Sequence, residues 1–551
     1  MEQRARFVAE VLDRAAHDRW RGSSVPITGD VADGTWVEVE VSGGVARPIA
    51  EPLARAGDAL VDLLRLAVEQ ELDPVFDDAV RAEVSAWEAD PGIDDPALVD
   101  LEALPFVTID NADSRDLDQA LFIERVGAGH VVRYALADAA HYVPRGSALF
   151  AEALRRAASY YLPGWMVPML PPELSEGLVS LNANVRRRAL VFEMHLDAAG
   201  ACVNTEVVRA RILSRAKLTY PGVQRFLDGD APDEANAEWA ESLSLLREVG
   251  ERRIADAAAR DVVRYRRRTV EVGLDERRAF VMFGGLRNDV ERYSEQLSLL
   301  TNSEGARLLR EGDEHAHVQA IYRVHPAPPE DRMRRFAEDL EELASKRGAR
   351  WRWDRKGGQS LASYLRSLPW VGDELRLTRA VQRQAIMTNV RSTFSDEASG
   401  HHGVGADAYA RFSAPMREVV GVFLHRELVE FLGGSGSADH SLMEQVIEAA
   451  NRAKNTQRKV TALSDRLALD QLLARDQARG HVHTGTVMGL TEAKIYVTLD
   501  EPPVDVKLYR RNLPDHGKGL GLGRSVRLRV EGRDAKNRWI LSPVTPPAGA
   551  S

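Results

Sequence analysis

Four aspartates occupy a nine-residue stretch in the first third of the chain, Asp110, Asp113, Asp116 and Asp118. Carboxylates this close repel one another unless a cation or an arginine network compensates their charge. Ligands that offer only oxygen suit Mg²⁺ or Mn²⁺ better than zinc. A Mg²⁺ ion held by one or two carboxylates can also bind substrate phosphate. That arrangement supports attack on a phosphodiester by metal-activated water.

Two other interpretations of this aspartate cluster stay open on composition alone. Such a cluster is also typical of a solvated acidic loop. A calcium loop of the EF-hand type is a third interpretation, although the glycine and the distant glutamate of such loops are missing at their spacings. The residues by themselves therefore leave three hypotheses open, of which a metal-dependent hydrolase is one.

The elements around the cluster are predicted to form an α/β body. An apolar strand over 106–109 ends at Asp110, and a loop then delivers the other carboxylates. Further strands are expected over 131–135 and 190–195. Helical periodicity predicts helices over about 148–158, 235–260, 288–312, 330–347, 376–392 and 415–432, with a helix-rich stretch continuing to about 478.

The two ends of the chain show different patterns. From residue 481 onward apolar residues alternate with period two, which predicts a small OB-type barrel. Its five expected strands cover 484–488, 493–499, 504–508, 526–530 and 539–541. At the front, the spacing predicts a helix over 3–19, a hairpin over 35–49 and a helix over 53–72. We expect a helix-turn-helix-like or winged-helix module there, with a degenerate OB fold as the alternative.

Charge is distributed unevenly along the 551 residues. The chain has 73 Lys+Arg and 83 Asp+Glu, a formal net charge of −10. Residues 1–109 hold 9 basic and 23 acidic side chains and carry −14, whereas residues 480–551 hold 11 basic and 7 acidic side chains and carry +4. An acidic total argues against a histone-like nucleic-acid binder, since phosphate neutralisation needs clustered cations. Only the body and the tail are candidates for phosphate contact.

Cysteine content and hydropathy indicate the compartment. The single cysteine, Cys202, excludes an internal disulfide and a cysteine-based zinc site. Acidic residues scattered through 1–20 are unlike a secretory signal. No run of about 18 uncharged apolar residues predicts a membrane span. We therefore expect a cytoplasmic protein, a monomer, with no membrane partner.

The residues around the cluster resemble a known family. The stretch 104–118, LPFVTIDNADSRDLD, resembles the hallmark motif of the ribonuclease II/ribonuclease R (RNB) family. Similar motifs follow in family order at 134–143, 160–171, 173–175, 216–220, 322–326 and 403–417. The resemblance covers roughly 75–475, and the tail looks like the S1-type OB fold that follows in that family.

This resemblance implies a hydrolytic 3′→5′ exoribonuclease that degrades single-stranded RNA from its 3′ end to nucleoside 5′-monophosphates. Mg²⁺ is the implied cofactor, with Mn²⁺ as a substitute. By position, Asp110, Asp116 and Asp118 match metal-binding and catalytic acids. Arg417 matches the family's phosphate-contacting arginine.

Two tyrosines match residues along the family's RNA path. Tyr161 matches the aromatic that packs on the terminal nucleotide, and Tyr220 matches a second aromatic. Stacking on such rings would suit sequence-independent binding, because every base has a π-face.

Several positions depart from the family pattern. Gln119 stands where a fourth aspartate is usual. Its amide oxygen is neutral, so we expect it to hold a second metal more weakly or through water. Gln457, an expected RNA-binding position, replaces a glutamate, and Gly421 lies where the family has an aspartate. Val270 aligns with the position of a base-stacking phenylalanine in the family. These departures keep a second hypothesis open, a catalytically weak or inactive RNA-binding protein.

The expected fold is multidomain α+β. It comprises a small N-terminal α/β module over 1–75, the catalytic α/β domain over 76–478 and the S1-type OB barrel over 479–548. Relatives usually have two OB domains at the front, for which this chain has too little room. A reduced front would leave a more open entrance, which predicts that partly structured RNA can also enter.

Overall fold

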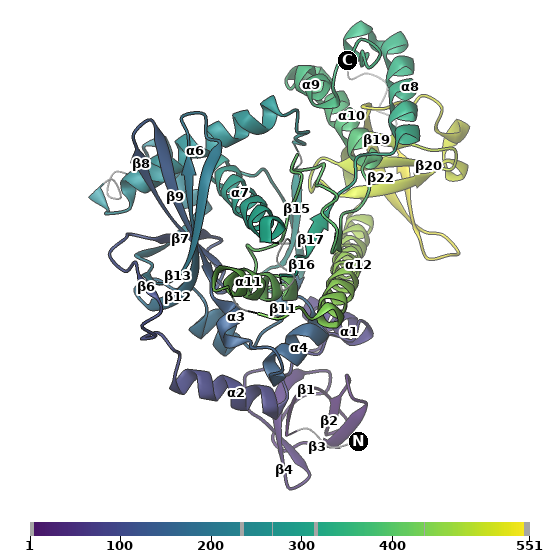
Figure 1. Cartoon of the computed structure of the whole chain (residues 1–551). Helices are drawn as coiled ribbons and strands as arrows, with labels where there is room; N and C mark the ends of the chain where they lie inside the picture. Colours follow the sequence, from purple (N-terminus) through teal and green to yellow (C-terminus); the bar gives the residue numbers. More distant parts are fainter. Residues whose placement is uncertain (1–4, 232–235, 267, 313–317, 435, 545–551) are drawn as a thin grey trace.

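A central sheet, two smaller β modules and the helices between them make up the protein (Figure 1). The computed structural model describes residues 5–231, 236–266, 268–312, 318–434 and 436–544. The multidomain α+β fold expected from the sequence is confirmed.

The central sheet has seven strands in the order β14-β7-β8-β9-β12-β13-β6. These strands are β6 (Val99–Asp100), β7 (Val107–Asp110), β8 (Gln119–Val126), β9 (Gly129–Ala137), β12 (Arg186–Leu196), β13 (Cys202–Leu213) and β14 (Ala216–Thr219). Neighbouring strands are antiparallel, except that β14 pairs in parallel with β7 and β6 with β13. Because β9 is buried on both faces, it is a nearly continuous apolar run.

Helices and short strands complete this body. The helices are α1 (Ala59–Glu69), α2 (Asp78–Ala89), α3 (Ala139–Tyr142), α4 (Ala148–Arg156), α5 (Tyr220–Asp228), α6 (Ala240–Ala259), α7 (Asp289–Gly312) and α11 (Val419–Leu432). The short strands form three antiparallel pairs: β10 (Tyr160–Leu162) with β11 (Trp165–Val167), β15 (Thr269–Leu274) with β16 (Phe280–Gly285), and β17 (Tyr322–Val324) with β18 (Thr393–Ser395). Helix α6 packs on β8, and α7 contacts both α6 and α11.

The N-terminal module is a five-stranded sheet in the order β3-β2-β1-β4-β5. Its strands are β1 (Arg6–Leu12), β2 (Ala15–Asp18), β3 (Ser23–Pro26), β4 (Trp36–Ser42) and β5 (Val45–Pro48). A parallel bridge between Ile27 and Ala46 brings the two edges together, as in an OB-like barrel. The predicted hairpin over 35–49 is confirmed by β4 and β5.

The helix predicted over 3–19 is wrong, and with it the helix-turn-helix hypothesis. Strand β1 is buried on both faces, with Phe7 in the barrel core and Val8 in the larger central core. A strand buried on both faces loses its alternation and can imitate helical spacing. Asp13 and Arg14, both in the left-handed region (φ 51° and 58°), form the tight turn into β2. The alternative weighed from the sequence, a degenerate OB fold, agrees with these strands.

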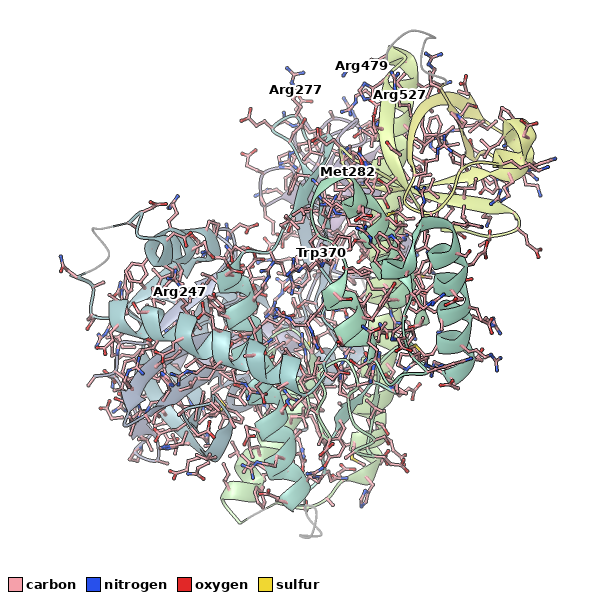
Figure 2. All side chains as sticks on the ribbon, turned by 90° about the horizontal axis from the view of Figure 1, so that it is seen from above. Arg247, Arg277, Met282, Trp370, Arg479 and Arg527 are labelled. Atoms are coloured by element: carbon pink, nitrogen blue, oxygen red, sulfur yellow. The ribbon has the colours of Figure 1, made fainter. Side chains whose placement is uncertain are left out.

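The C-terminal module is a barrel in the order β21-β20-β19-β22-β23. Its strands are β19 (Val482–Leu490), β20 (Lys494–Leu499), β21 (Asp505–Tyr509), β22 (Ser525–Arg533) and β23 (Trp539–Pro543), so all five predicted strands are confirmed. Val526 and Leu528 point into the barrel core while Arg527 is exposed between them. Met282 of β16 packs against both the barrel core and the central core, at the junction seen from above in Figure 2.

Helices also join the barrel to the body. Helices α8 (Glu330–Arg347), α9 (Leu361–Ser367) and α10 (Leu375–Thr388) have a core of their own, and α10 packs on β19. Helix α12 (His440–Arg479) is 40 residues long and contacts α1, α4, β10 and β22. Within the described ranges no helix, α12 included, combines the length and apolar character that crossing a bilayer requires.

Candidate catalytic site

The aspartate loop lies between two neighbouring strands of the central sheet. Strand β7 ends at Asp110 and β8 begins at Gln119, so the loop lies at one edge of both strands. The hydroxyl of Ser180 receives a hydrogen bond from Leu117 N (3.0 Å) and donates one to Arg115 O (2.7 Å). Lys217 Nζ donates to Ala112 O at 2.9 Å. These bonds to the backbone hold the loop in a defined shape and leave its carboxylates free for other contacts.

Asp118 is the buried centre of the site, with 1% of its surface exposed. Its Oδ1 accepts a hydrogen bond from Met416 N (3.0 Å), and its Oδ2 accepts one from Arg417 Nε (2.5 Å). Burial raises the pKa of Asp118 to about 6, and the Arg417 guanidinium opposes that rise. Asp118 in return keeps the pKa of Arg417 well above its ordinary value, although burial acts in the other direction.

The other predicted acids and both tyrosines lie around this pair. Tyr161, half exposed on β10, donates from its hydroxyl to Asp116 Oδ2 at 2.9 Å. Asp110 Oδ1 accepts from Asn111 N and from Ser114 Oγ, each at 2.8 Å. Burial raises the pKa of Tyr220 to about 12, and the nearby Asp110 carboxylate adds to the shift.

Asp113 differs from these acids. It is exposed on the loop, and no hydrogen bond or ion pair joins it to the described part of the chain. The cluster seen in the sequence therefore separates into three acids that face Arg417 and the two tyrosines, and one that does not.

Gln119 has hydrogen bonds to both ends of its amide. Its Nε2 donates to Ser413 O at 2.5 Å. Its Oε1 accepts from Ser298 Oγ at 3.1 Å and also from the Tyr134 hydroxyl. The amide oxygen that we expected to help hold a second metal is thus directed at two hydroxyls. Tyr134 and Ser298 were not among the predicted site residues, and no local motif marks them.

Gln457 lies on α12 and is linked to the backbone of Arg417 through one residue, Ser159. Its Nε2 donates to Ser159 O at 2.9 Å, and Ser159 N donates to Arg417 O at 3.0 Å. Val270, on β15, instead packs against the core of the C-terminal barrel. The structure thus brings Gln457 to the edge of the site and gives Val270 a packing role in the barrel junction.

Glu418 is a further buried acid beside the site that sequence reasoning missed. Its Oε1 accepts from Lys454 Nζ (2.9 Å) and lies 3.3 Å from Arg411 Nε. Burial alone would raise the pKa of Glu418, but Arg411 and Lys454 outweigh it and lower that pKa to about 2. Residues 418 and 454 are 36 positions apart, so no sequence spacing could have revealed this pair.

The donor set agrees with a hard cation. Asp110 and Asp116 each have one carboxylate oxygen without a hydrogen bond to the described residues, and Mg²⁺ needs only one or two such carboxylates. Among the described residues, no group of three or more His, Cys, Asp or Glu side chains is already arranged around a single metal position. The site therefore offers suitable ligands, with further ligands to come from water and substrate.

A scan against protein families matches the RNB domain over residues 98–434. This chain belongs to the RNB family. The matched range contains the aspartate loop and Arg417, so the resemblance seen in the sequence is confirmed.

Curated relatives of this RNB protein are named Ribonuclease R. That of Vibrio cholerae is 32% identical over 339 residues, covering 60% of this chain and 39% of its own length. That of Escherichia coli is 28% identical over 478 residues, covering 80% of this chain and 57% of its own. The chain thus spans about half the length of these relatives.

Solved structures share the fold. Mycoplasma genitalium RNase R, in complex with ribose-methylated single-stranded RNA, matches with a TM-score of 0.79 at 20% identity over 98% of this chain and 90% of that one. Yeast Ssd1, described as a pseudonuclease, matches with a TM-score of 0.62 at 14% identity over 98% of this chain and 67% of that one. At these identities the likeness is one of fold.

Proposed function

We propose that this RNB protein is a metal-dependent hydrolytic exoribonuclease that shortens single-stranded RNA from its 3′ end and releases nucleoside 5′-monophosphates. The observation that carries the proposal is the buried Asp118 carboxylate held against Arg417 beside Asp110 and Asp116. The name of its relatives, Ribonuclease R, and the RNA bound to a solved neighbour support the substrate class.

Arg417 is the proposed phosphate-binding residue. Only its Nε is engaged, by Asp118, and its two terminal nitrogens donate to no acceptor in the described part of the chain. A guanidinium fixed in this way can direct its remaining donors at the scissile phosphate and stabilise the charge that develops there. Asp118 fixes the plane of the guanidinium, while the backbone N–H of Met416 fixes Asp118.

Asp110 and Asp116, with Asp118 beside them, are the proposed ligands of Mg²⁺ or Mn²⁺. A bound Mg²⁺ lowers the pKa of a coordinated water and offsets negative charge on the phosphate. Because the amide oxygen of Gln119 accepts from Tyr134 and Ser298, we leave it out of this ligand set.

Tyr161 and Tyr220 are proposed to contact the RNA. The half-exposed ring of Tyr161 can stack on a base while its hydroxyl stays on Asp116. Tyr220 lies near Asp110 and suits a second contact along the strand. Both contacts are independent of base identity, as an enzyme that removes every nucleotide in turn requires.

A catalytically inactive RNA-binding protein is the second candidate. Gln119 and Gly421 replace acids of the family pattern, and a pseudonuclease shares the fold, so the fold alone does not decide between the two. The presence of Asp110, Asp116, Asp118 and Arg417 together in one site favours the enzyme.

The deciding experiment follows 5′-labelled single-stranded RNA incubated with the protein and Mg²⁺ on a sequencing gel. We expect progressive shortening from the 3′ end, with mononucleotide recovered from a body-labelled substrate. RNA that stays intact while a gel shift shows it bound would favour the inactive binding protein.

Entry of partly structured RNA is a finer part of the proposal. The front has one OB-like barrel in an acidic segment, so we expect little phosphate contact there and an open approach to the site. A hairpin with a 3′ overhang should be degraded into its stem. Arrest several nucleotides before the stem would contradict this expectation. The single cysteine is our basis for proposing that the enzyme works in a reducing cytoplasm.

A further inference from the structure

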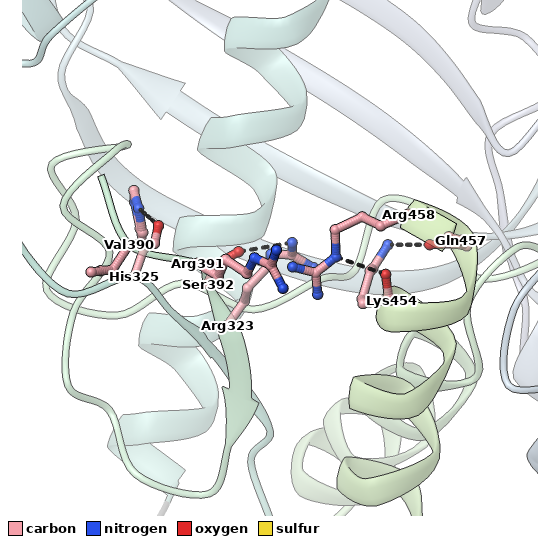
Figure 3. A pocket seen from close by; sticks show the side chains of 8 residues that line it. All are labelled: Arg323, His325, Val390, Arg391, Ser392, Lys454, Gln457 and Arg458. Carbon is pink, nitrogen blue, oxygen red and sulfur yellow. Dashed lines mark hydrogen bonds between the residues drawn. The ribbon is translucent and has the colours of Figure 1, made fainter. Parts of the chain in front are cut away.

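A cavity of about 330 Å³ lies beside the catalytic site, where three elements meet (Figure 3). Arg323 comes from β17, Arg391 and Ser392 from the segment before β18, and Lys454, Gln457 and Arg458 from α12. We call this cavity the basic pocket. Four of its lining side chains are cationic, and no residue that lines the pocket carries a carboxylate.

The protein neutralises the cations of the basic pocket only in part. Lys454 pairs with Glu418, whose Oε1 also faces Arg411. Arg323 donates to Ser392 Oγ (2.9 Å) and lies 5.1 Å from the ring centroid of Phe394.

Arg391 and Arg458, the two exposed arginines of the basic pocket, have no acidic partner among the described residues. Arg458 donates to Lys454 O (2.9 Å) and to Asn455 Oδ1 (3.1 Å), both on its own helix. Within the described ranges, neither Arg458, Arg391 nor Arg323 has a carboxylate oxygen within 4.0 Å. The pocket therefore holds an excess of positive charge in a confined space.

The directions in which the pKa values of Arg323 and Lys454 are shifted agree with this excess of positive charge. Burial lowers the pKa of Arg323 against the opposing attraction of Glu418, and the positive charges of Arg411 and Arg458 add to the lowering. Burial also lowers the pKa of Lys454, against the pull of Glu418. A bound anion would relieve both the repulsion among the cations and the cost of their burial.

The basic pocket shares a wall with the catalytic site. Lys454 Nζ donates to Gln457 Oε1 at 3.1 Å, and Gln457 is linked through both backbone groups of Ser159 to Arg417 O. Glu418, which faces the pocket cations, directly follows Arg417 in the chain. The pocket is therefore joined to the backbone of the proposed phosphate-binding arginine through a single residue, Ser159.

We propose that the basic pocket binds a phosphate monoester, presented either as a free ligand such as inorganic phosphate or a mononucleotide, or as the 3′-terminal phosphate of an RNA. A monoester carries nearly two negative charges at neutral pH, whereas each internal phosphodiester carries one, so the excess of cations matches the monoester better. Arginine forks suit its oxygens, and the cavity is at the small end of ligand-pocket sizes. Only the RNA-linked source rests on the proposed function.

The test measures equilibrium binding by calorimetry in metal-free buffer, using inorganic phosphate and adenosine 5′-monophosphate as probes. The pocket variant combines Arg391→Gln with Arg458→Gln and so removes both exposed arginines. A second, milder variant carries Arg458→Gln alone. The control variant, Lys459→Gln with Arg466→Gln, removes two exposed charges of α12 outside the pocket. A further variant, Arg417→Gln, reports monoester bound at the catalytic site instead.

We expect affinity to fall roughly tenfold or more in the pocket variant, to fall less in Arg458→Gln, and to stay within about twofold in the control and in Arg417→Gln. Equal affinity in the pocket variant and the full wild-type chain would overturn the proposal. So would binding that only Arg417→Gln abolishes.

Gel shifts with RNA ending in a 3′-phosphate or a 3′-hydroxyl then separate the two sources. A tighter complex with the 3′-phosphate, lost in the pocket variant, assigns the pocket to RNA ends. Monoester binding without that preference assigns it to free ligand. Because these assays need no hydrolysis, a protein that fails to degrade RNA can still pass or fail them.

Discussion

Two of the three acids of the catalytic site differ from its two glutamines in how they use their hydrogen-bonding capacity. Asp110 and Asp116 each leave a carboxylate oxygen without a hydrogen bond to the described residues. Gln119 and Gln457 instead use both the oxygen and the nitrogen of their amides. All of these bonds join separate elements except the one from Lys454 to Gln457, which lies within α12. The difference teaches that the acids are available to ligands from outside, whereas the glutamines connect parts of the protein.

Removal of divalent metal should have the largest effect on this comparison. We expect a chelator to reduce RNA hydrolysis to background and added Mg²⁺ or Mn²⁺ to restore it, because Asp110 and Asp116 each keep a carboxylate oxygen that no hydrogen bond from the described residues occupies. The measurement is the rate of mononucleotide release before and after dialysis against the chelator. Unchanged hydrolysis in the metal-free protein would show that the acids act without a metal.

Asp118→Asn should lower hydrolysis about a thousandfold, since it weakens both the Arg417 contact and the negative charge at the centre of the site. Single-turnover rates on labelled RNA measure this loss. Asp113→Asn makes the same chemical change on an exposed acid of the same loop and should keep nearly full activity. Equal losses in both variants would mean that the acids are not separated as the structure shows.

Arg417→Lys should cost on the order of a hundredfold in rate, less than the loss of Asp118. Lysine keeps the positive charge, but its single nitrogen cannot contact Asp118 and also present the planar pair of nitrogens that a guanidinium directs at a phosphate. The rate constant at saturating RNA and the apparent affinity for RNA should be compared, and the rate should carry most of the loss. A change confined to affinity would make Arg417 a general RNA contact.

Gln119→Glu, a change to one of the two glutamines, should lower the stability of the protein. The change removes the donor to Ser413 O and places a carboxylate against that carbonyl, which should lower the free energy of unfolding by about 1–3 kcal/mol. Urea denaturation measures it, with Gln445→Glu on the exposed face of α12 as the control. A stability equal to that of the control would show that the Gln119 bonds contribute little.

Local patterns account for what could be predicted from the sequence. Strands β21 and β22 have one buried and one exposed face, so their alternation is visible, whereas β1 is buried on both faces and its spacing imitates that of a helix. The aspartate loop is a local motif. Arg417, 299 positions from Asp118, was reached only through the family resemblance.

The basic pocket and the Glu418–Lys454 pair were out of reach of sequence reasoning. The pocket depends on β17 and α12, whose contributing residues lie more than 100 positions apart, and Glu418 lies 36 positions from Lys454, so these groups meet only when the fold is complete. No periodicity or motif reports such a meeting, because each cation by itself resembles an ordinary surface residue.

The length of α12 fixes a distance inside the molecule. An uninterrupted 40-residue helix measures about 60 Å, and it carries Gln457 beside the catalytic site before Asp470 accepts a hydrogen bond from Trp539 of the C-terminal barrel. The barrel is therefore mounted on a rigid rod rather than on a flexible tether. Between Gln457 and Asp470 the helix advances 13 residues, about 20 Å, so the spacing between the aspartate site and the barrel is fixed by the rise of one helix.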